Sequence, residues 1–181
     1  MEKISKIIPL LLLLLLTGNL VFAQNENNNW FFGQNCGLTF NPLAASTGNL
    51  NTFEGCASIS DESGNLLFYT DGKSVINKYH LSMTNGTGLL GSSSSSSSAI
   101  IVPKPCSTSE YYIFIVDDIV GSNGINHTLV DMDDNGDCYV SSSETGQVVL
   151  SSKNINLPGP TSEKNCVVKK SNNLDYWVIT T

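Results

Sequence analysis

The stretch from Phe53 to Gly72 (FEGCASISDESGNLLFYTDG) constrains the fold more than any other part of the sequence. It contains two short runs with a β pattern, Ala57–Ser60 and Leu66–Thr70. The residues between them, at positions 61–65, are of the types that accept tight turns and positive φ angles. The stretch therefore predicts a β-hairpin without help from the rest of the chain.

The same unit occurs twice more along the chain. Ala99–Val102 precedes the apolar run Tyr111–Val116, and Cys166–Val168 precedes Tyr176–Ile179. The units are unevenly spaced, which insertions into loops explain. A strand, a turn, a bulkier second strand and a longer connection to outer strands are the plan of a propeller blade. We therefore predict an all-β chain that forms a partial β-propeller of about three four-stranded blades, with a two-sheet sandwich as the competing architecture.

Other segments complete this prediction. Trp30–Gly33 opens an aromatic strand, and Gly37–Phe40 is expected to continue that strand after a bend. Ser74–His80 alternates as a third strand should, and Tyr111–Val116 is apolar on both faces, as a strand between two sheets should be. Seven consecutive serines, Ser92–Ser98, are expected to form a flexible surface loop.

The first 23 residues have the pattern of a secretory signal peptide. Lys3 and Lys6 precede the apolar run Ile7–Leu16, and Val21–Ala23 ends in the small residue that cleavage requires. The apolar run is shorter than the ~20 residues that a membrane span needs. We expect export, cleavage after residue 23, and no membrane span in the remaining propeller-like domain at 24–181.

The charge excludes two classes of partner. The chain has a formal net charge of −7 and contains no arginine. Binding to phosphate backbones depends on cationic contacts, so nucleic acid and anionic membrane surfaces are not expected as partners.

The length of the sequence predicts that the protein continues beyond it. At ~40–50 residues per blade, residues 24–181 hold about three blades, whereas the smallest common closed ring has four. The sequence also stops inside an apolar strand, an exposed edge on which natural domains rarely end. We therefore expect an N-terminal fragment of a longer protein, incomplete at its C-terminus.

A series of ordered motifs points to a family. The motifs are WFFG at 30–33, FEGCA at 53–57, GNLLFYTDG at 64–72, NGTGLLG at 85–91, AIIVPK at 99–104, VDM at 130–132 and YWVIT at 176–180. In these the chain resembles the N-terminal region of large exported proteins of gliding Gram-negative bacteria. Those proteins typically end in a type B sorting domain of the type IX secretion system, often named the gliding-motility-associated C-terminal domain.

The resemblance covers nearly all of residues 24–181. It implies a propeller-like region that passes through the periplasm and is displayed at the cell surface, and it implies no catalytic residue. This sequence has no C-terminal sorting domain, and a product without one is expected to stay in the periplasm. Its run of cysteines is also unusual for the family.

One segment resembles half of a calcium loop. Asp131, Asp133 and Asn135 occupy the first ligand positions and Gly136 the sixth, but Ser142 stands where the loop requires a glutamate. The flanking runs at 126–132 and 138–142 have a β pattern, so an acidic hairpin turn is the simpler interpretation. Ca²⁺ is the one cofactor that the sequence suggests.

Signals for catalysis are sparse. Four carboxylates that could include a glycosidase pair are Glu54, Asp61, Asp71 and Asp117. No spacing selects two of them, and carboxylates beside glycine are usually turn residues. His80 and His127 lack metal-ligand spacing, and no G-x-S-x-G motif provides a nucleophilic serine. The sequence therefore assigns no catalytic residue.

The cysteines and the aromatic residues are expected to have structural roles. The five cysteines include no C-x-x-C pair, so we interpret them as small buried side chains. Cys106 and Cys138 would lie on the first and fourth strands of one blade, three ladder spacings of ~4.8 Å apart, beyond the ~7 Å reach of a disulfide. Six aromatics are expected to pack between blades rather than to line a sugar-binding surface: Trp30, Phe31, Tyr111, Tyr112, Tyr176 and Trp177.

These observations favour an exported, adhesion-type surface protein whose propeller region binds a protein or glycan ligand. A secreted propeller hydrolase acting on polysaccharide is the main alternative. A truncated gene product without activity is the third.

Overall fold

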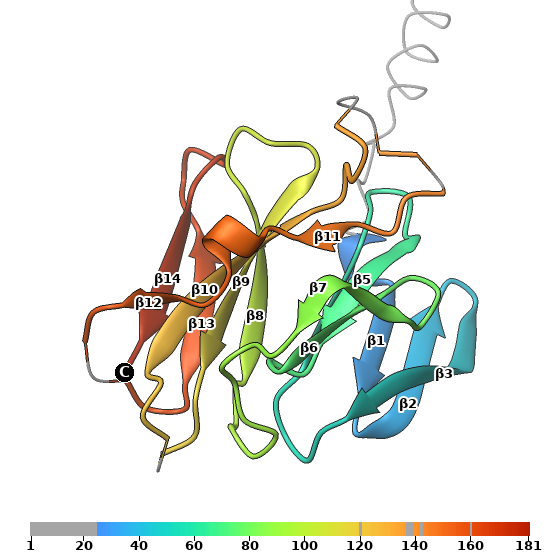
Figure 1. The fold of residues 1–181 in the computed structure, drawn as a ribbon. Coiled ribbons are helices and arrows are strands. Elements are labelled where there is room, and N and C mark those ends of the chain that lie inside the picture. The colour runs from blue at the N-terminus through green and yellow to red at the C-terminus, as the bar shows by residue number, and fades with distance from the viewer. Residues whose placement is uncertain (1–24, 120, 137–139, 142, 160) are drawn as a thin grey trace, which may run out of the picture.

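The computed structural model describes residues 25–181 except 120, 137–139, 142 and 160 (Figure 1). In this described part, the regular elements are strands apart from two short 3-10 turns, η1 (Asn25–Asn27) and η2 (Leu150–Ser152). The prediction of an all-β fold is confirmed. The predicted signal peptide at 1–23 lies outside the described residues.

The first sheet is a three-stranded antiparallel meander. Its strands are β1 (Asn29–Phe32), β2 (Gln34–Phe40) and β3 (Leu43–Asn51). The prediction that Gly37–Phe40 continues the first strand was wrong, because the chain reverses and Trp30 pairs with Leu38. Gly33 and Asn35 make the reversal with φ angles of 59° each, a region in which glycine and asparagine are tolerated best.

The second meander begins with the predicted hairpin. Its strands follow in sequence order: β4 (Ala57–Ser60), β5 (Leu66–Thr70), β6 (Ser74–Asn77) and β7 (Ser82–Thr87). The Asp61 carboxylate closes the first turn by accepting the backbone N–H groups of Ser63 and Asn65. Strand β6 is shorter than predicted, because the Asn77 side chain accepts the N–H groups of two later residues and turns the chain.

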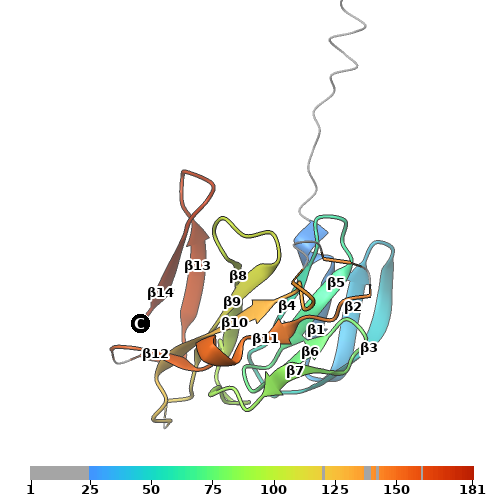
Figure 2. The ribbon, with the colours of Figure 1, turned by 45° about the horizontal axis from the view of Figure 1, so that its top comes forward.

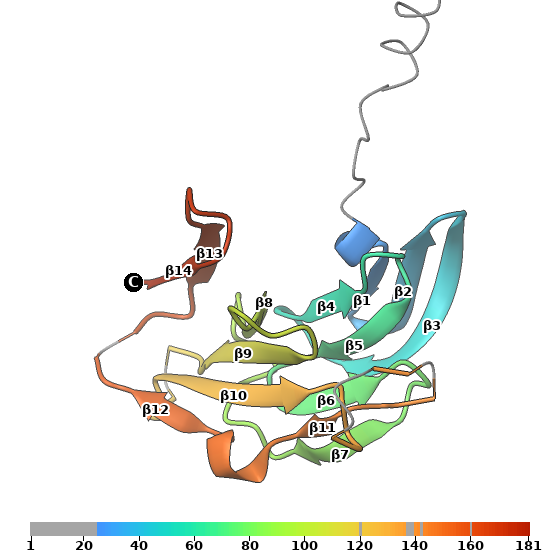
Figure 3. The same cartoon turned by 90° about the horizontal axis from the view of Figure 1, so that it is seen from above.

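The third meander extends the same sheet. Its strands are β8 (Ala99–Pro103), β9 (Glu110–Val116), β10 (Ile125–Asp131), β11 (Gln147–Val148) and β12 (Ile155–Leu157). Strands β11 and β12 pair with different halves of β10. A parallel bridge between Gln147 and Thr84 joins β11 to β7. The sheet curls until its end strands β4 and β8 lie side by side, so that it is nearly closed (Figure 3).

The last strands form a separate hairpin. Strands β13 (Asn165–Lys169) and β14 (Tyr176–Thr180) pair with each other, and β13 lies beside β8 (Figure 2). The first sheet and this hairpin are therefore the first and last layers of the molecule, with the second and third meanders between them (Figure 3).

Two hydrophobic cores hold the layers together. Phe31 and Leu50 of the first sheet pack on Tyr69 and Ile76 of the second meander. The other face of that meander packs on the third in the larger core, which includes Ile59, Leu67, Phe68, Val75, Ile113, Ile115, Val130 and Val148. Adjacent residues of a strand point to opposite faces, so Phe68 and Tyr69 place β5 in both cores. Ile113 and Ile115 of β9 are fully buried in the larger core, whereas Tyr112 and Phe114 on the other face of the strand are half-buried, so the expected burial on both faces holds in part.

The strand directions define two ends of the molecule. Gly55 donates its N–H to the Ser95 carbonyl, and Ser97 donates its N–H to the Glu163 carbonyl. Strands β4, β8 and β13 therefore begin at the same end and run in the same direction. Strand β1 runs the opposite way, because Asn29 bonds to Ser60 at the far end of β4 while Phe31 bonds to Ser58.

Candidate functional site at the loop end

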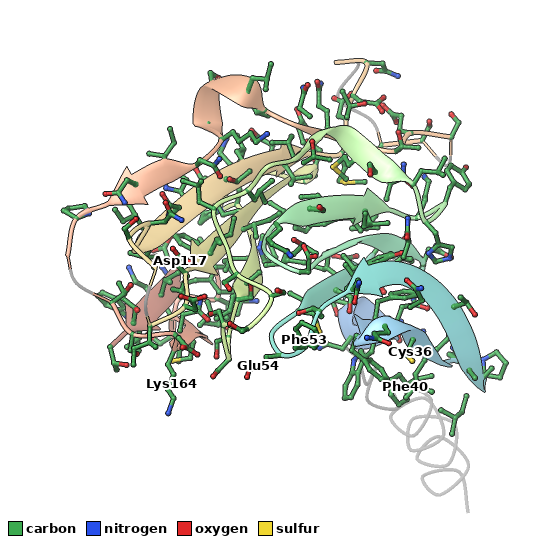
Figure 4. All side chains as sticks on the ribbon, turned by 60° about the horizontal axis from the view of Figure 1, so that its bottom comes forward. Cys36, Phe40, Phe53, Glu54, Asp117 and Lys164 are labelled. Carbon is green, nitrogen blue, oxygen red and sulfur yellow. The ribbon has the colours of Figure 1, made fainter. Side chains whose placement is uncertain are left out.

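Five connections gather where β4, β8 and β13 begin. They are the loops at 52–56, 71–73 and 88–98, together with the described parts of 117–124 and 158–164. We call this surface the loop end. Figure 4 views the molecule from this side and labels Phe53, Glu54, Asp117 and Lys164 on it. Because loops from successive meanders meet here, this end combines side chains that are far apart in the sequence.

The serine run lies at the centre of the loop end. The prediction of a flexible surface loop was wrong for Ser95 and Ser98, both of which are fully buried. The Ser98 hydroxyl donates to the Asp71 carbonyl at 2.7 Å. A side chain at Gly72, whose φ is 82°, would begin 2.1 Å from the Ser98 oxygen. Close packing against glycine backbone therefore orders this run.

Glu163 ties three connections together. One carboxylate oxygen accepts the Ser96 N–H at 3.1 Å and the Ser96 hydroxyl at 2.9 Å, and the other accepts the Ile119 N–H at 3.0 Å. These hydrogen bonds favour the charged form and hold the pKa of the Glu163 carboxyl below its usual value. The last hairpin is thereby fastened to the loops that precede β8 and β10.

Further polar and apolar groups surround Ser96. The Glu54 carboxylate lies 3.3 Å from the Ser96 hydroxyl, and the Ser92 hydroxyl donates to Asp118 at 2.8 Å. Phe53 and Ile119 leave 77 % and 80 % of their surfaces exposed in the same region. The loop end therefore offers acceptor oxygens, hydroxyl groups and an exposed aromatic ring to a ligand.

The structure separates the four carboxylates that the sequence singled out. Asp71 accepts the N–H groups of Lys73 and Ser74 and is buried, and Asp117 accepts two N–H groups from Asn123. Both are turn residues of the loop end, whereas Asp61 closes the turn at the opposite end of the molecule. Of the four, Glu54 is the one whose carboxylate meets the serine run.

Sequence reasoning missed Glu163 and Asp118. A usable signal was present for Glu163, because it stands shortly before β13 as Glu54 stands shortly before β4. That correspondence becomes visible once the three units are aligned by their first strands. Asp118 has no such signal, since its contact with Ser92 depends on the approach of two loops.

The two histidines pack among aromatic rings. His80 has a φ of 61° and its Nδ1 lies 3.0 Å from the Tyr69 hydroxyl, which accepts the Asn49 N–H. Burial lowers the pKa of His127, which lies beside the rings of Tyr112 and Phe114. These surroundings give both histidines structural roles.

The acidic hairpin segment is only partly described. Asp131 accepts the Ser109 hydroxyl and the Asp133 N–H, and Asp133 accepts the Gly136 N–H, as turn residues do. The flanking run 138–142 lies largely outside the described residues, as does Ser142. Within the described residues, no group of three or more His, Cys, Asp or Glu side chains is placed to hold a metal ion. The Ca²⁺ site at Asp131, Asp133 and Asn135 stays a prediction.

The described cysteines are free thiols. Cys36, Cys106 and Cys166 are exposed and Cys56 is half-buried, which contradicts the interpretation that all are buried. Burial is the main cause that raises the pKa of Cys56. Cys138 lies outside the described residues.

Of the aromatic side chains that the sequence singled out, some are buried and others are exposed. Phe31 is buried against Tyr69, and Tyr111 meets Phe68 edge to face at 5.7 Å, as packing between layers requires. Trp30 and Trp177 are instead half exposed.

Two open cavities lie at the other end of the sheets. The larger, of about 690 Å³, is lined by residues that include Asn29, Asn65 and Tyr79. The smaller, of about 490 Å³, is lined by Glu26, Glu62 and Tyr111 among others. Asp61 borders both cavities, but it is held by its turn, so we place the candidate site at the loop end.

Comparison with known proteins gives no identification, because no family model, curated protein or solved structure matches this chain. Among the described residues, we find no helix of the length and apolar character needed to cross a membrane.

Proposed function

We propose that the chain is an arc of a β-propeller and that it serves as an exported binding module whose ligand contacts the loop end. In a propeller, the first strands of successive blades run in the same direction around a shared axis. Strands β4, β8 and β13 begin beside one another at the loop end, and this is the observation that supports the proposed architecture.

The aromatic residues give independent support. The second strands of the second meander, the third meander and the last hairpin each carry two adjacent aromatics, at positions 68–69 in β5, 111–112 in β9 and 176–177 in β14. Strand β1 carries three adjacent aromatics at 30–32 and has the direction of a second strand, not of a first strand. The first sheet therefore corresponds to the second, third and fourth strands of a blade.

Binding at the loop end follows from what is exposed there. The ring of Phe53 presents a flat apolar surface, next to the Glu54 carboxylate and the hydroxyl groups of the serine run. Sugars combine apolar ring faces with hydroxyl groups, so an aromatic ring beside acceptor oxygens suits a glycan ligand. We propose a glycan, or a protein that carries one, as the ligand.

Export and display rest on the sequence. The signal-peptide pattern at 1–23 supports export, and the resemblance to exported proteins of gliding bacteria supports adhesion at the cell surface. The proposed location is the cell surface if the protein carries a C-terminal sorting domain, and the periplasm otherwise.

A glycan array tests the function. The purified protein is expected to retain a defined set of glycans, and Phe53→Ala and Glu54→Gln are expected to abolish retention. Phe40→Ala provides the control, because Phe40 is also an exposed phenylalanine but lies at the far end of β2. Retention that survives both loop-end substitutions would place the ligand elsewhere.

A polysaccharide hydrolase is the second candidate, because the carboxylates of Glu54 and Glu163 both lie close to the Ser96 hydroxyl. The lowered pKa of Glu163 does not suit a general acid, which needs a raised pKa. Assays on a panel of polysaccharide substrates distinguish the two candidate functions. If the protein hydrolyses one of them and Glu54→Gln abolishes that activity, the hydrolase is favoured over the binding module.

A further inference from the structure

We propose that the loop end selects glycans that carry a free amino group, with the ammonium group bound between the carboxylates of Glu54 and Glu163. This inference rests on the proposed glycan-binding function and adds the chemical class of the ligand. The two carboxylates approach the same hydroxyl group, since the Glu54 oxygen lies 3.3 Å and the Glu163 oxygen 2.9 Å from the Oγ atom of Ser96. One ammonium group beside that hydroxyl can therefore lie within ion-pair distance of both carboxylates.

The Ser96 hydroxyl cannot satisfy both carboxylates. A serine hydroxyl carries one hydrogen, so it donates to one acceptor at a time. The shorter contact is with Glu163, and the Ser96 N–H also donates to that carboxylate. The longer contact is the one hydrogen bond of the Glu54 side chain within the described residues. The Glu54 carboxylate is therefore open to a donor that a ligand brings.

The loop end carries an excess of negative charge. The described residues of its connections include five carboxylates but two lysines, Lys73 and Lys164. Among the described residues, the ion pairs lie in the turns that follow β8 and β13, and none involves Glu54 or Glu163. Hydrogen bonds hold the pKa of Glu163 below its usual value despite the nearby Asp118 carboxylate, so Glu163 is charged at neutral pH. A cationic ligand therefore meets two carboxylates that no lysine of this region neutralises.

The backbone that carries Phe53 and Glu54 is held against the serine run. The Phe53 N–H donates to the Ser93 carbonyl at 3.1 Å, and the Gly55 N–H donates to the Ser95 carbonyl at 3.0 Å. Hydrogen bonds on both sides of Glu54 thus fix the segment that presents the aromatic ring and the carboxylate. A site that is ordered before the ligand arrives loses less entropy on binding.

An amino sugar matches this combination of groups. Its ring has an apolar face that can pack on the exposed Phe53 ring, and its ammonium group is attached directly to that sugar ring. A lysine side chain of a protein ligand carries the same charge at the end of a flexible stem, and ordering that stem costs entropy. Sugars with carboxylate or sulfate groups would be repelled by the negative charge of the loop end. The observations therefore favour a glycan with free amino groups.

Calorimetric titration with three matched oligosaccharides tests the inference. The tetramers of chitosan, chitin and cellulose share one backbone and differ in one substituent of each sugar, which is an ammonium, an acetamide or a hydroxyl group. The chitosan tetramer is expected to bind at least about tenfold more tightly than the other two, because it alone brings a cation.

The outcomes separate this inference from the proposed function. Equal affinity for the three tetramers, or tighter binding of the chitin tetramer or of an acidic glycan on the array, would overturn the inference and leave glycan binding intact. A protein that binds none of the tetramers and no glycan on the array would overturn the proposed function as well.

Two variants with the same change of charge locate the ammonium group. Glu54→Gln is expected to weaken binding of the chitosan tetramer at least about tenfold, so that the preference among the tetramers disappears. Glu62→Gln is the control, because Glu62 is an exposed residue of the turn between β4 and β5, at the opposite end of the molecule. It should leave the preference intact, and circular dichroism checks that both variants fold.

Two further results would contradict the inference. Equal losses of affinity in the two variants would show attraction to the overall negative charge instead of a site at Glu54. An oligolysine peptide that binds as tightly as the chitosan tetramer would show that the site selects the charge alone and not a sugar that carries it.

Discussion

The phenyl ring of Phe31 lies flat against the phenol ring of Tyr69, with ring centroids 4.3 Å apart and ring planes 17° apart. Both residues are almost completely buried. Stacked aromatic pairs contribute free energy beyond the area that they bury. This stack joins the first sheet to the second meander.

Truncation of Phe31 is therefore expected to be costly. Phe31→Ala should lower the free energy of unfolding by about 3–5 kcal/mol, the range for large aromatic side chains in cores. Phe32→Ala, on the outer face of the same strand, should cost roughly 1 kcal/mol, because its side chain is partly exposed. Urea unfolding of both variants checks the contrast, and equal losses would contradict the role of the stack.

Gly48 is predicted to depend on the same ring. A Cβ atom at Gly48 would overlap the Cδ1 atom of Phe31, so Gly48→Ala should destabilise the protein by about 1–3 kcal/mol. In a Phe31→Leu background the same substitution should cost less, since the ring is gone. A double-mutant cycle measures this coupling, and additive losses would contradict it.

The serine run should respond to substitution according to burial. Ser98→Ala removes the buried hydroxyl that bonds to Asp71 and should cost about 1–2 kcal/mol. Ser94→Ala, at an exposed serine, should change stability by no more than about 0.5 kcal/mol. Thermal unfolding compares the two variants, which lose the same hydroxyl group. Equal losses of stability would indicate that the serine run is disordered.

Acid is expected to loosen the last hairpin through Glu163. The pKa of Glu163 is lower in the folded chain than in the unfolded chain, so its charged form stabilises the fold above the ordinary glutamate pKa. That contribution is lost as the pH falls through the lowered folded pKa. The protection factors of the Ser96 and Ile119 amides, which correct for the slower intrinsic exchange in acid, should therefore fall as the pH is lowered, and Glu163→Gln should show low protection already at neutral pH. Slow exchange in the variant at neutral pH would contradict the role of this carboxylate.

Alkaline pH is expected to lower the stability of the protein by ionising its buried tyrosines. Burial is the main cause that raises the pKa values of Tyr69 and Tyr111, and nearby Asp61 adds to the shift at Tyr111. The protonated phenols stabilise the fold fully below the unfolded tyrosine pKa of about 10, and this contribution is lost as the pH rises through the raised folded values. Stability measured by denaturant between pH 8 and 11 should fall less steeply in Tyr111→Phe.

Tyr69→Phe gives the complementary result. Besides a flatter alkaline decline, it should show a pH-independent loss of about 1 kcal/mol, because the hydroxyl accepts the Asn49 N–H and bonds to His80. If the dependence of stability on pH were unchanged in both variants, groups other than these two tyrosines would cause the loss of stability in alkali.

The local sequence pattern was sufficient to predict the hairpin at 57–70. Its strands have the predicted bounds, and the Asp61 turn between them is made by residues two to four positions apart. The burial of one face of β9 also followed from its unbroken apolar run. Such features depend on neighbours along the chain, which a sequence displays directly.

Local pattern failed where distant segments decide the conformation. Asn85–Gly86 has the composition of a turn, but both residues lie inside β7, where the Asn85 side chain bonds to the Val148 carbonyl. Positions 48–51 also suggest a turn, yet they continue β3, and Leu50 enters the core beside Phe31. Tertiary packing outweighed turn propensity at both positions.

The candidate site shows the same division. By itself, the sequence determined an all-β chain with a repeated two-strand unit, because alternation of side chains along a strand is a local property. It also marked Glu54 beside the first strand of one unit. Only the tertiary structure placed Ser96 between Glu54 and Glu163, because hydrogen bonds between loops of successive meanders depend on how the sheets stack. Stacking likewise decided that Phe31 is buried, whereas Trp30, its neighbour in β1, is half exposed on the other face of the sheet.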